Sequence, residues 1–149
     1  MAHTHTLLLY HLIFSTQKRV PMLTPEIRSV VFPYMSGIIA NNGGESYIIN
    51  GVEDHVHILC RLKSKPDVAD IVHDIKGGAS SWFNKQPGVT SLHWQVGYGA
   101  FTVSYSQMNR VFKYIENQEE HHREKTFAEE YEGFLKRHRI SYDPRFMLD

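Results

Sequence analysis

The segment from Glu53 to Cys60 constrains the fold of this chain more than any other feature. It reads Glu-Asp-His-Val-His-Ile-Leu-Cys, which is typical of a short apolar strand. Residues two apart on a strand project to the same face, so His55 and His57 would present their imidazoles side by side, while Val56 turns the other way into a core. Two imidazoles on a rigid strand form half of a divalent metal site.

The His-x-His pattern needs a second signal, because 10 of the 149 residues are histidine. Taken alone, the pair is more simply a pair of satisfied strand histidines. The second signal is the segment Lys-Tyr-Ile-Glu-Asn-Gln at 113–118. Tyr114 and Gln118 are four residues apart, so we expect both side chains on one face of a single helix.

These four side chains combine chemically. Two histidines and the Gln118 amide oxygen can bind a divalent ion, and such an ion polarises a phosphodiester. A phenol has an ordinary pKa of about 10, so it needs a nearby cation or metal to act as a nucleophile. Tyr114 could then attack phosphorus, giving a phosphotyrosine and a free hydroxyl group.

Apolar runs and amphipathic segments alternate along the chain in the order β-α-β-β-α-β-α. We expect strands at 7–15, 46–50, 54–62 and 92–105, and helices that begin near Thr24, Asp67, Ser106 and Phe127. This order predicts an α+β fold, a ferredoxin-like or RRM-like antiparallel sheet with helices packed on one face. The second face needs a cover, which could be a helix, a partner chain or a nucleic acid.

Proline and glycine residues predict where individual helices and strands begin, bend or weaken. Thr24-Pro25 should begin a helix that runs to Asn41, with a kink or break at Pro33. Gly77-Gly78 should weaken the middle of the second helix. Gly97 and Gly99 suggest a bulge, or a surface that another backbone approaches closely.

Composition limits the class of protein. The length of 149 residues predicts one domain, 1–149, with residues 136–149 as a C-terminal appendage. The formal net charge is zero, so no global basic field attracts nucleic acid, and local patches and shape must do so. The single Cys60 excludes an internal disulfide. The apolar runs are too short to span a bilayer and no basic-then-apolar leader opens the chain, so we expect a cytoplasmic protein without membrane contact.

Several motifs in one order carry a family resemblance. His55-Val56-His57 resembles the His-hydrophobic-His motif of the HUH endonucleases, and the segment 114–118 is similar to the nucleophile motif of their single-tyrosine transposases. These are small insertion-sequence enzymes that move DNA as a single strand. The resemblance continues through 94–101, 118–122 and 142–146, and so covers nearly the whole chain.

The resemblance implies a transposase, an endonuclease and strand transferase that acts on single-stranded DNA with hairpin ends. It implies that His55, His57 and Gln118 bind Mg²⁺ or Mn²⁺, and that Tyr114 forms a 5′-phosphotyrosine and releases a 3′-hydroxyl. It also implies a homodimer whose sheets join, in which Tyr114 lies nearer to the partner's histidines than to its own.

Further candidates are weaker. Asp54 is either a solvated turn carboxylate or a partner that orients a ligand imidazole. Candidate DNA contacts are Lys18, Arg19, Lys76, Tyr98, Phe101, Arg110, Lys113 and His121.

Two other functions remain open from the residues alone. One is a non-catalytic single-stranded nucleic-acid-binding module that stacks bases on Tyr10, Tyr98 and Phe101 of an RRM-like sheet. The other is a replication-initiator or relaxase-type HUH nuclease.

Overall fold

A computed structural model describes residues 3–89 and 91–148 of the chain. Four antiparallel strands form one sheet in the order β2-β3-β1-β4. The strands are β1 (Leu8–Ser15), β2 (Glu45–Val52), β3 (His55–Leu62) and β4 (Gly99–Thr102). The predicted α+β class is confirmed.

The helices begin where the sequence signals place them, except for the one near Ser106. The helices are α1 (Pro25–Asn41), α2 (Val68–Asn84), α3 (Met108–Glu116), α4 (Gln118–His121) and α5 (Phe127–Arg137), with short 3-10 turns at Gln17–Arg19 and Tyr105–Gln107. The Thr24 hydroxyl caps α1 and Asp67 caps α2 by accepting hydrogen bonds from backbone amides. The helix expected to start at Ser106 instead begins at Met108, after the 3-10 turn.

Both helices are continuous at the positions where a break or a weakening was expected. Helix α1 continues through Pro33, and its later residues Met35 and Ile39 are fully buried, so tertiary packing holds the helix beyond the proline. Helix α2 continues through both glycines. A Cβ at Gly78 would lie 2.8 Å from Ile38 Cδ1, so this glycine lets α1 and α2 approach closely.

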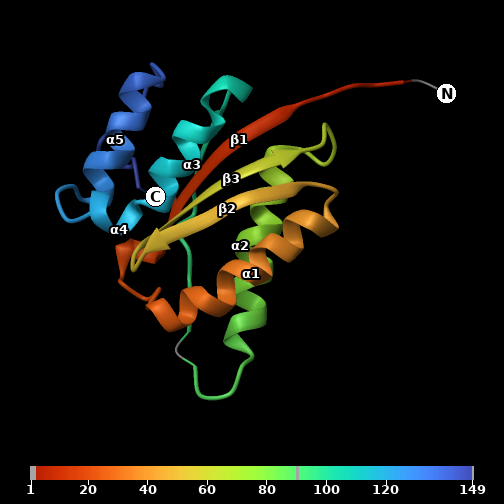
Figure 1. Cartoon of the computed structure of the whole chain (residues 1–149). Helices are drawn as coiled ribbons and strands as arrows, with labels where there is room; N and C mark the ends of the chain where they lie inside the picture. The colour runs from red at the N-terminus through yellow and green to blue at the C-terminus, as the bar shows by residue number, and fades with distance from the viewer. Residues whose placement is uncertain (1–2, 90, 149) are drawn as a thin grey trace.

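The two faces of β3 divide as the strand period predicts. Val56, Ile58 and Cys60 point into the main core, which α1 and α2 close from one side. His55 and His57 point to the opposite face, where α3, α4 and α5 lie (Figure 1). The cover of the second face, left open by the sequence, is therefore supplied by helices of the same chain.

A second apolar cluster joins α5 to this face. It is made of Ile13, Phe101, Phe127, Tyr131, Phe134 and Leu135. Phe101 is only 4% exposed in this cluster, so its ring has no free face for a nucleotide base. Tyr10 packs against the main core. The base-stacking surface that an RRM-like binding module needs is thus covered, and the predicted contact of Phe101 with DNA is not supported.

The strand expected at 92–105 is much shorter than predicted. Only Gly99–Thr102 joins the sheet, and before it a single bridge links Trp94 to Thr16. The intervening backbone is held by side chains instead, because the Lys76 ammonium donates hydrogen bonds to the carbonyl oxygens of Gln95 (2.7 Å) and Gly97 (2.9 Å). Lys76 is thus occupied inside the chain, which contradicts its predicted role as a DNA contact.

The C-terminal appendage packs back onto the domain. The boundary predicted at residue 136 falls inside α5, which extends to Arg137. Tyr142, Met147 and Leu148 contact the second apolar cluster, and Gln95 donates a hydrogen bond to the Leu148 carbonyl at 3.1 Å. Among the described residues, no helix is both long and apolar enough to cross a membrane.

Candidate metal and tyrosine site

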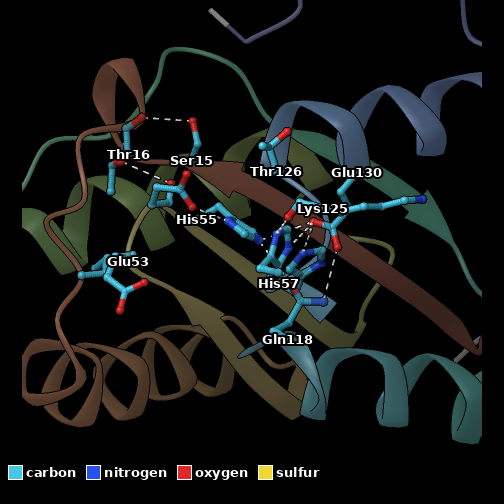
Figure 2. A network of polar contacts seen from close by, with 12 residues as sticks. Ser15, Thr16, Glu53, His55, His57, Gln118, Lys125, Thr126 and Glu130 are labelled. Atoms are coloured by element: carbon cyan, nitrogen blue, oxygen red, sulfur yellow. Dashed lines mark hydrogen bonds and ion pairs between the residues drawn. The ribbon is translucent and has the colours of Figure 1, made fainter. Parts of the chain in front are cut away.

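His55 and His57 lie side by side on β3, and both side chains are fully buried. Their Nε2 atoms point to one carboxylate, Glu130 of α5, at 3.4 Å and 2.9 Å from Oε1 (Figure 2). Gln118, the first residue of α4, places its Oε1 atom 3.2 Å from His55 Nε2. The two histidines and the glutamine predicted from the sequence therefore meet in one cluster.

Each histidine is oriented by a hydrogen bond at its other ring nitrogen. His55 Nδ1 lies 2.7 Å from Asp54 Oδ1, and His57 Nδ1 lies 2.7 Å from His11 Nε2. Such partners fix the ring orientation of metal-binding histidines. Asp54, one of two open alternatives in the sequence, does contact the imidazole.

Sequence reasoning missed His11. It lies on β1, next to the strand that carries His57, and its partner across the ladder is Leu59, two residues from His57. This diagonal neighbourhood is within reach of long side chains. A pairing register for β1 and β3 would have revealed the contact, but the sequence does not supply one.

Glu130 joins the histidines to the tyrosine. Glu130 is 3% exposed, and its two carboxylate oxygens face different groups. Oε1 lies close to the histidines, at 2.9 Å from His57 Nε2 and 3.1 Å from His122 Nε2. Oε2 accepts a hydrogen bond from the Tyr114 hydroxyl and lies 3.2 Å from His121 Nε2.

Glu130 and His122 were not candidate ligands in the sequence. A signal for Glu130 was present, because it falls on the apolar stripe of α5 with Phe127, Tyr131 and Phe134. A carboxylate at a core-facing helical position calls for a buried partner. His122 follows α4 as its C-cap residue, and nothing in its neighbours distinguishes it from a solvated histidine.

Tyr114 projects from α3 toward this cluster. Its ring centroid is 5.8 Å from that of His57, and its hydroxyl oxygen is 3.1 Å from His121 Nε2. The expectation that Tyr114 and Gln118 share one helix is wrong. Helix α3 ends at Glu116, the chain turns at Asn117, and Gln118 begins α4. The two residues still meet, because Gln118 Nε2 donates a hydrogen bond to the Tyr114 carbonyl at 3.3 Å.

The donor set fits a divalent cation. His55, His57, His122 and Glu130 each offer a ligand atom, and these atoms all lie within 4.8 Å of one another. Imidazole nitrogens and carboxylate oxygens are ordinary ligands of divalent ions in proteins. The chain therefore contains a group that can hold such an ion, with a tyrosine hydroxyl beside it.

The electrostatics of the cluster follow from burial and from Glu130. Burial acts to lower the pKa of His55, but hydrogen bonds to Asp54 and Glu130 outweigh it and raise the pKa to about 9. Burial lowers the pKa of His57 to about 4, although Glu130 opposes this.

The pKa of the Glu130 carboxyl and the pKa of the Tyr114 phenol shift in opposite directions. Burial acts to raise the pKa of Glu130, but hydrogen bonds to His122, His55 and His57 outweigh it and hold the pKa far below its ordinary value. Burial, and then the negative charge of Glu130, raise the pKa of Tyr114 well above its ordinary value. Without added positive charge, Tyr114 is therefore a protonated phenol next to an ionised carboxylate.

The remaining predicted DNA contacts surround the cluster on two sides. Lys18 and Arg19 are exposed and border an open groove of about 720 Å³, which Asp54 and His122 also line. A second hollow of about 640 Å³ lies on the Tyr114 side and is bordered by Arg110, Lys113 and His121. Tyr98 is 36% exposed, lies beside Lys76 and lines neither hollow.

Comparison with known proteins decides the family. Residues 4–118 match the family described as "Transposase IS200 like". This chain belongs to that family. It is therefore an enzyme of the single-tyrosine transposase type that its motifs resemble, rather than a replication initiator or relaxase. The matched range includes His55, His57, Tyr114 and Gln118 and ends before α5.

Individual relatives agree with this assignment. The ISDra2 transposase TnpA of Deinococcus radiodurans is 30% identical over 115 residues, which span 73% of this chain and 82% of the relative. A solved structure described as a putative transposase from Deinococcus radiodurans R1 is 29% identical, with a TM-score of 0.60 over 79% of this chain and 95% of that one.

A more distant structure shares the fold. The structure of a REP-associated tyrosine transposase bound to a REP hairpin is 14% identical, with a TM-score of 0.58, and the match covers 82% of this chain and 74% of that one.

Proposed function

We propose that this transposase cleaves and rejoins single-stranded DNA at hairpin ends, with Tyr114 as the nucleophile. One observation carries the proposal. The Tyr114 hydroxyl and the Nε2 atoms of His55 and His57 contact the same carboxylate, so the nucleophile lies beside the candidate metal site. A nucleophile and an electrophilic site within reach of one phosphate are what phosphoryl transfer requires.

In the proposed step, the Tyr114 hydroxyl oxygen forms a bond to the scissile phosphorus and the bond from phosphorus to the 3′ oxygen breaks. The products are a 5′-phosphotyrosine and a free 3′-hydroxyl. The phenol gives up one proton and the released oxygen takes up one, and the nearest acceptor for the phenolic proton is Glu130. His55, His57 and Gln118 would hold Mg²⁺ or Mn²⁺, which polarises the phosphate when bound.

The groove bordered by Lys18 and Arg19 is the proposed path of the DNA strand. Its acidic residues are already engaged, since Glu53 and Glu119 both pair with Arg28, at 3.8 Å and 3.1 Å. No ion pair forms at Lys18 or Arg19 within residues 3–89 and 91–148, so these cations are free to bind phosphate.

Replacement of Tyr114 tests the nucleophile. Tyr114→Phe removes only the hydroxyl, so it should bind hairpin DNA like the wild type and form no covalent adduct. Tyr105→Phe is the matched control, because Tyr105 is 73% exposed and outside the cluster, and it should still form the adduct. An adduct that resists denaturant in Tyr114→Phe would refute the assignment.

Replacement of a histidine tests the metal site. His57→Ala should fold, bind DNA and lose metal-dependent cleavage, because one imidazole ligand is gone. Full-rate cleavage by His57→Ala in the presence of a chelator would rule out this site.

The charge balance motivates a prediction about hairpins. Counter-ion release needs many cationic contacts, and a chain with a formal net charge of zero offers only local ones, so we expect DNA structure to contribute more to the affinity than net charge. Affinity should therefore be higher for a hairpin than for an unstructured strand of the same length. Equal affinities in a fluorescence anisotropy titration would contradict this.

We propose a homodimer in which the sheets join, and a cytoplasmic location, which suits the single buried Cys60. The strand order leaves β2 and β4 as the edges of the sheet. However, α5 already buries the second face of the sheet within one chain, so that burial no longer requires a partner.

The structure also bears on whether the active site is shared between subunits. One chain already places Tyr114 against its own Glu130, 5.8 Å from its own His57 ring, which favours a site in cis over the exchange implied by the resemblance. Mixing Tyr114→Phe with His57→Ala chains tests this. Recovery of cleavage in verified heterodimers would establish exchange, and no recovery would establish a cis site.

A further inference from the structure

Three imidazoles converge on one carboxylate oxygen. His57, His122 and His55 place their Nε2 atoms 2.9, 3.1 and 3.4 Å from Glu130 Oε1. One negative charge needs at most one of them as a partner. The arrangement is therefore richer in ligand atoms than a structural ion pair.

The hydrogen bonds at the far side of these rings decide which nitrogen carries the hydrogen. His122 Nδ1 lies 2.7 Å from the Lys125 carbonyl oxygen, and His55 Nδ1 lies 2.7 Å from the Asp54 carboxylate. Both partners only accept hydrogen bonds, so both Nδ1 atoms must be the donors. A neutral ring of this tautomer directs its Nε2 lone pair at the Glu130 carboxylate, whereas a ring that carries a second proton, as the raised pKa of His55 favours, donates from Nε2 to Glu130 instead.

A nitrogen lone pair and a carboxylate oxygen at hydrogen-bond distance repel each other unless positive charge lies between them. The Gln118 oxygen adds a further acceptor, at 3.2 Å from His55 Nε2. Extra protons or one cation would satisfy this geometry, and a divalent ion satisfies all the acceptors at once.

We propose that Glu130 and His122 join His55, His57 and Gln118 in a site that binds Mn²⁺ in preference to Mg²⁺, with the second oxygen of Glu130 holding Tyr114. Both added residues lie beyond the range 4–118 that matches the family. Nitrogen-rich sites favour transition-metal ions, whereas Mg²⁺ prefers oxygen ligands and water. This inference rests on the proposed metal site and adds its ligands and its selectivity.

The second oxygen gives the same carboxylate a positioning role. Because Oε1 belongs to the histidine cluster and Oε2 accepts the Tyr114 hydrogen bond, the position of the nucleophile depends on how Glu130 is held. Gln118 Nε2 approaches Oε2 from another side, at 3.4 Å. An ion bound at Oε1 would therefore also fix where the hydroxyl lies.

Calorimetric titration of the metal-free full chain with Mn²⁺ and with Mg²⁺, without DNA, tests the proposal. Wild type should bind Mn²⁺ at least tenfold more tightly than Mg²⁺. Glu130→Gln keeps the shape and removes the charge, so it should weaken Mn²⁺ binding by about tenfold or more. Glu132→Gln removes the same charge from the outer face of α5 and should bind Mn²⁺ within twofold of wild type.

His122→Gln provides a second variant if Glu130→Gln fails to fold, and it should also weaken Mn²⁺ binding by about tenfold. Hydrogen exchange adds a readout that does not depend on activity, since Mn²⁺ should increase protection of the α5 amides in wild type and not in Glu130→Gln. Unchanged Mn²⁺ affinity in both variants, or equal affinities of wild type for Mn²⁺ and Mg²⁺, would overturn the proposal. The function proposed above would survive that result if His57→Ala still abolished metal binding and cleavage.

Discussion

Gly99 offers the sharpest test of how α5 is positioned. A Cβ built at this residue would lie 2.7 Å from Tyr131 Cε1 and 3.0 Å from both the Tyr131 hydroxyl oxygen and Phe101 Cε2. Tyr131 is 6% exposed and its ring stacks on Phe127 at 5.5 Å, so it has little room to move. Gly99→Ala should therefore lower the free energy of unfolding by about 1–3 kcal/mol, the usual cost of overpacking a core.

The substitution should also reach the metal site. Tyr131 directly follows Glu130 on α5, so a ring pushed away from β4 moves the carboxylate away from His57. We expect the Mn²⁺ affinity of Gly99→Ala to fall together with its stability. For a chain of this size, each kcal/mol corresponds to a shift in Tm of about 2–4 °C, which differential scanning calorimetry resolves.

The same chemical change on α5 serves as the control. Gly133 lies inside the helix, with no atom within 4 Å of the position of an added Cβ. Gly133→Ala should be neutral or more stable by about 0.5–1 kcal/mol, because alanine is the better helix former.

A double-mutant cycle with Tyr131→Leu isolates the clash. Once the Tyr131 ring is removed, Gly99→Ala should lower the free energy of unfolding by much less than it does in the wild-type background. An equal cost in both backgrounds, or full stability of Gly99→Ala alone, would refute this account of how β4 holds α5.

Four further predictions concern Asp54, His55, Lys76 and Lys18. Asp54→Asn removes the charge that orients His55, so Mn²⁺ affinity in a calorimetric titration should fall by about 10–100-fold, and an unchanged affinity would mean that Asp54 does not support the ligand. The pKa of His55 is raised to about 9, so below that pH an ion must displace a proton from His55 to bind. Mn²⁺ affinity should therefore rise by up to about tenfold per pH unit until about pH 9. A flat affinity profile from pH 6.5 to 9 would show that no proton is displaced. Lys76→Met leaves the carbonyl oxygens of Gln95 and Gly97 unpaired, so Tm should fall while the salt dependence of DNA binding stays unchanged. Lys18→Met should instead reduce the slope of log DNA affinity against log salt concentration by about 1. A reduced slope in Lys76→Met and an unchanged slope in Lys18→Met would contradict the roles given to the two lysines.

The sequence alone determined the local features of this protein. The strand period placed His55 and His57 on one face and Val56 on the other, because that alternation is a property of the backbone. The helix start at Thr24 was likewise readable, since its cap involves atoms only three residues apart. The motif around Tyr114 indicated the family before any contact was known.

The tertiary structure decided the features that depend on distant segments. Glu130 meets His57 across 73 positions of the chain, and His11 meets it across 46. The apolar stripe of α5 indicates a buried carboxylate at Glu130 but not its partner, and nothing local indicates the His11 contact. The His11 contact arises from the pairing register of β1 with β3, and the Glu130 contact arises from the docking of α5 on the second sheet face. The strand expected at 92–105 is confined to Gly99–Thr102 for the same kind of reason. No sequence pattern links Lys76, on α2, with Gly97, yet the Lys76 ammonium donates a hydrogen bond to the Gly97 carbonyl oxygen at 2.9 Å, just before the strand begins at Gly99.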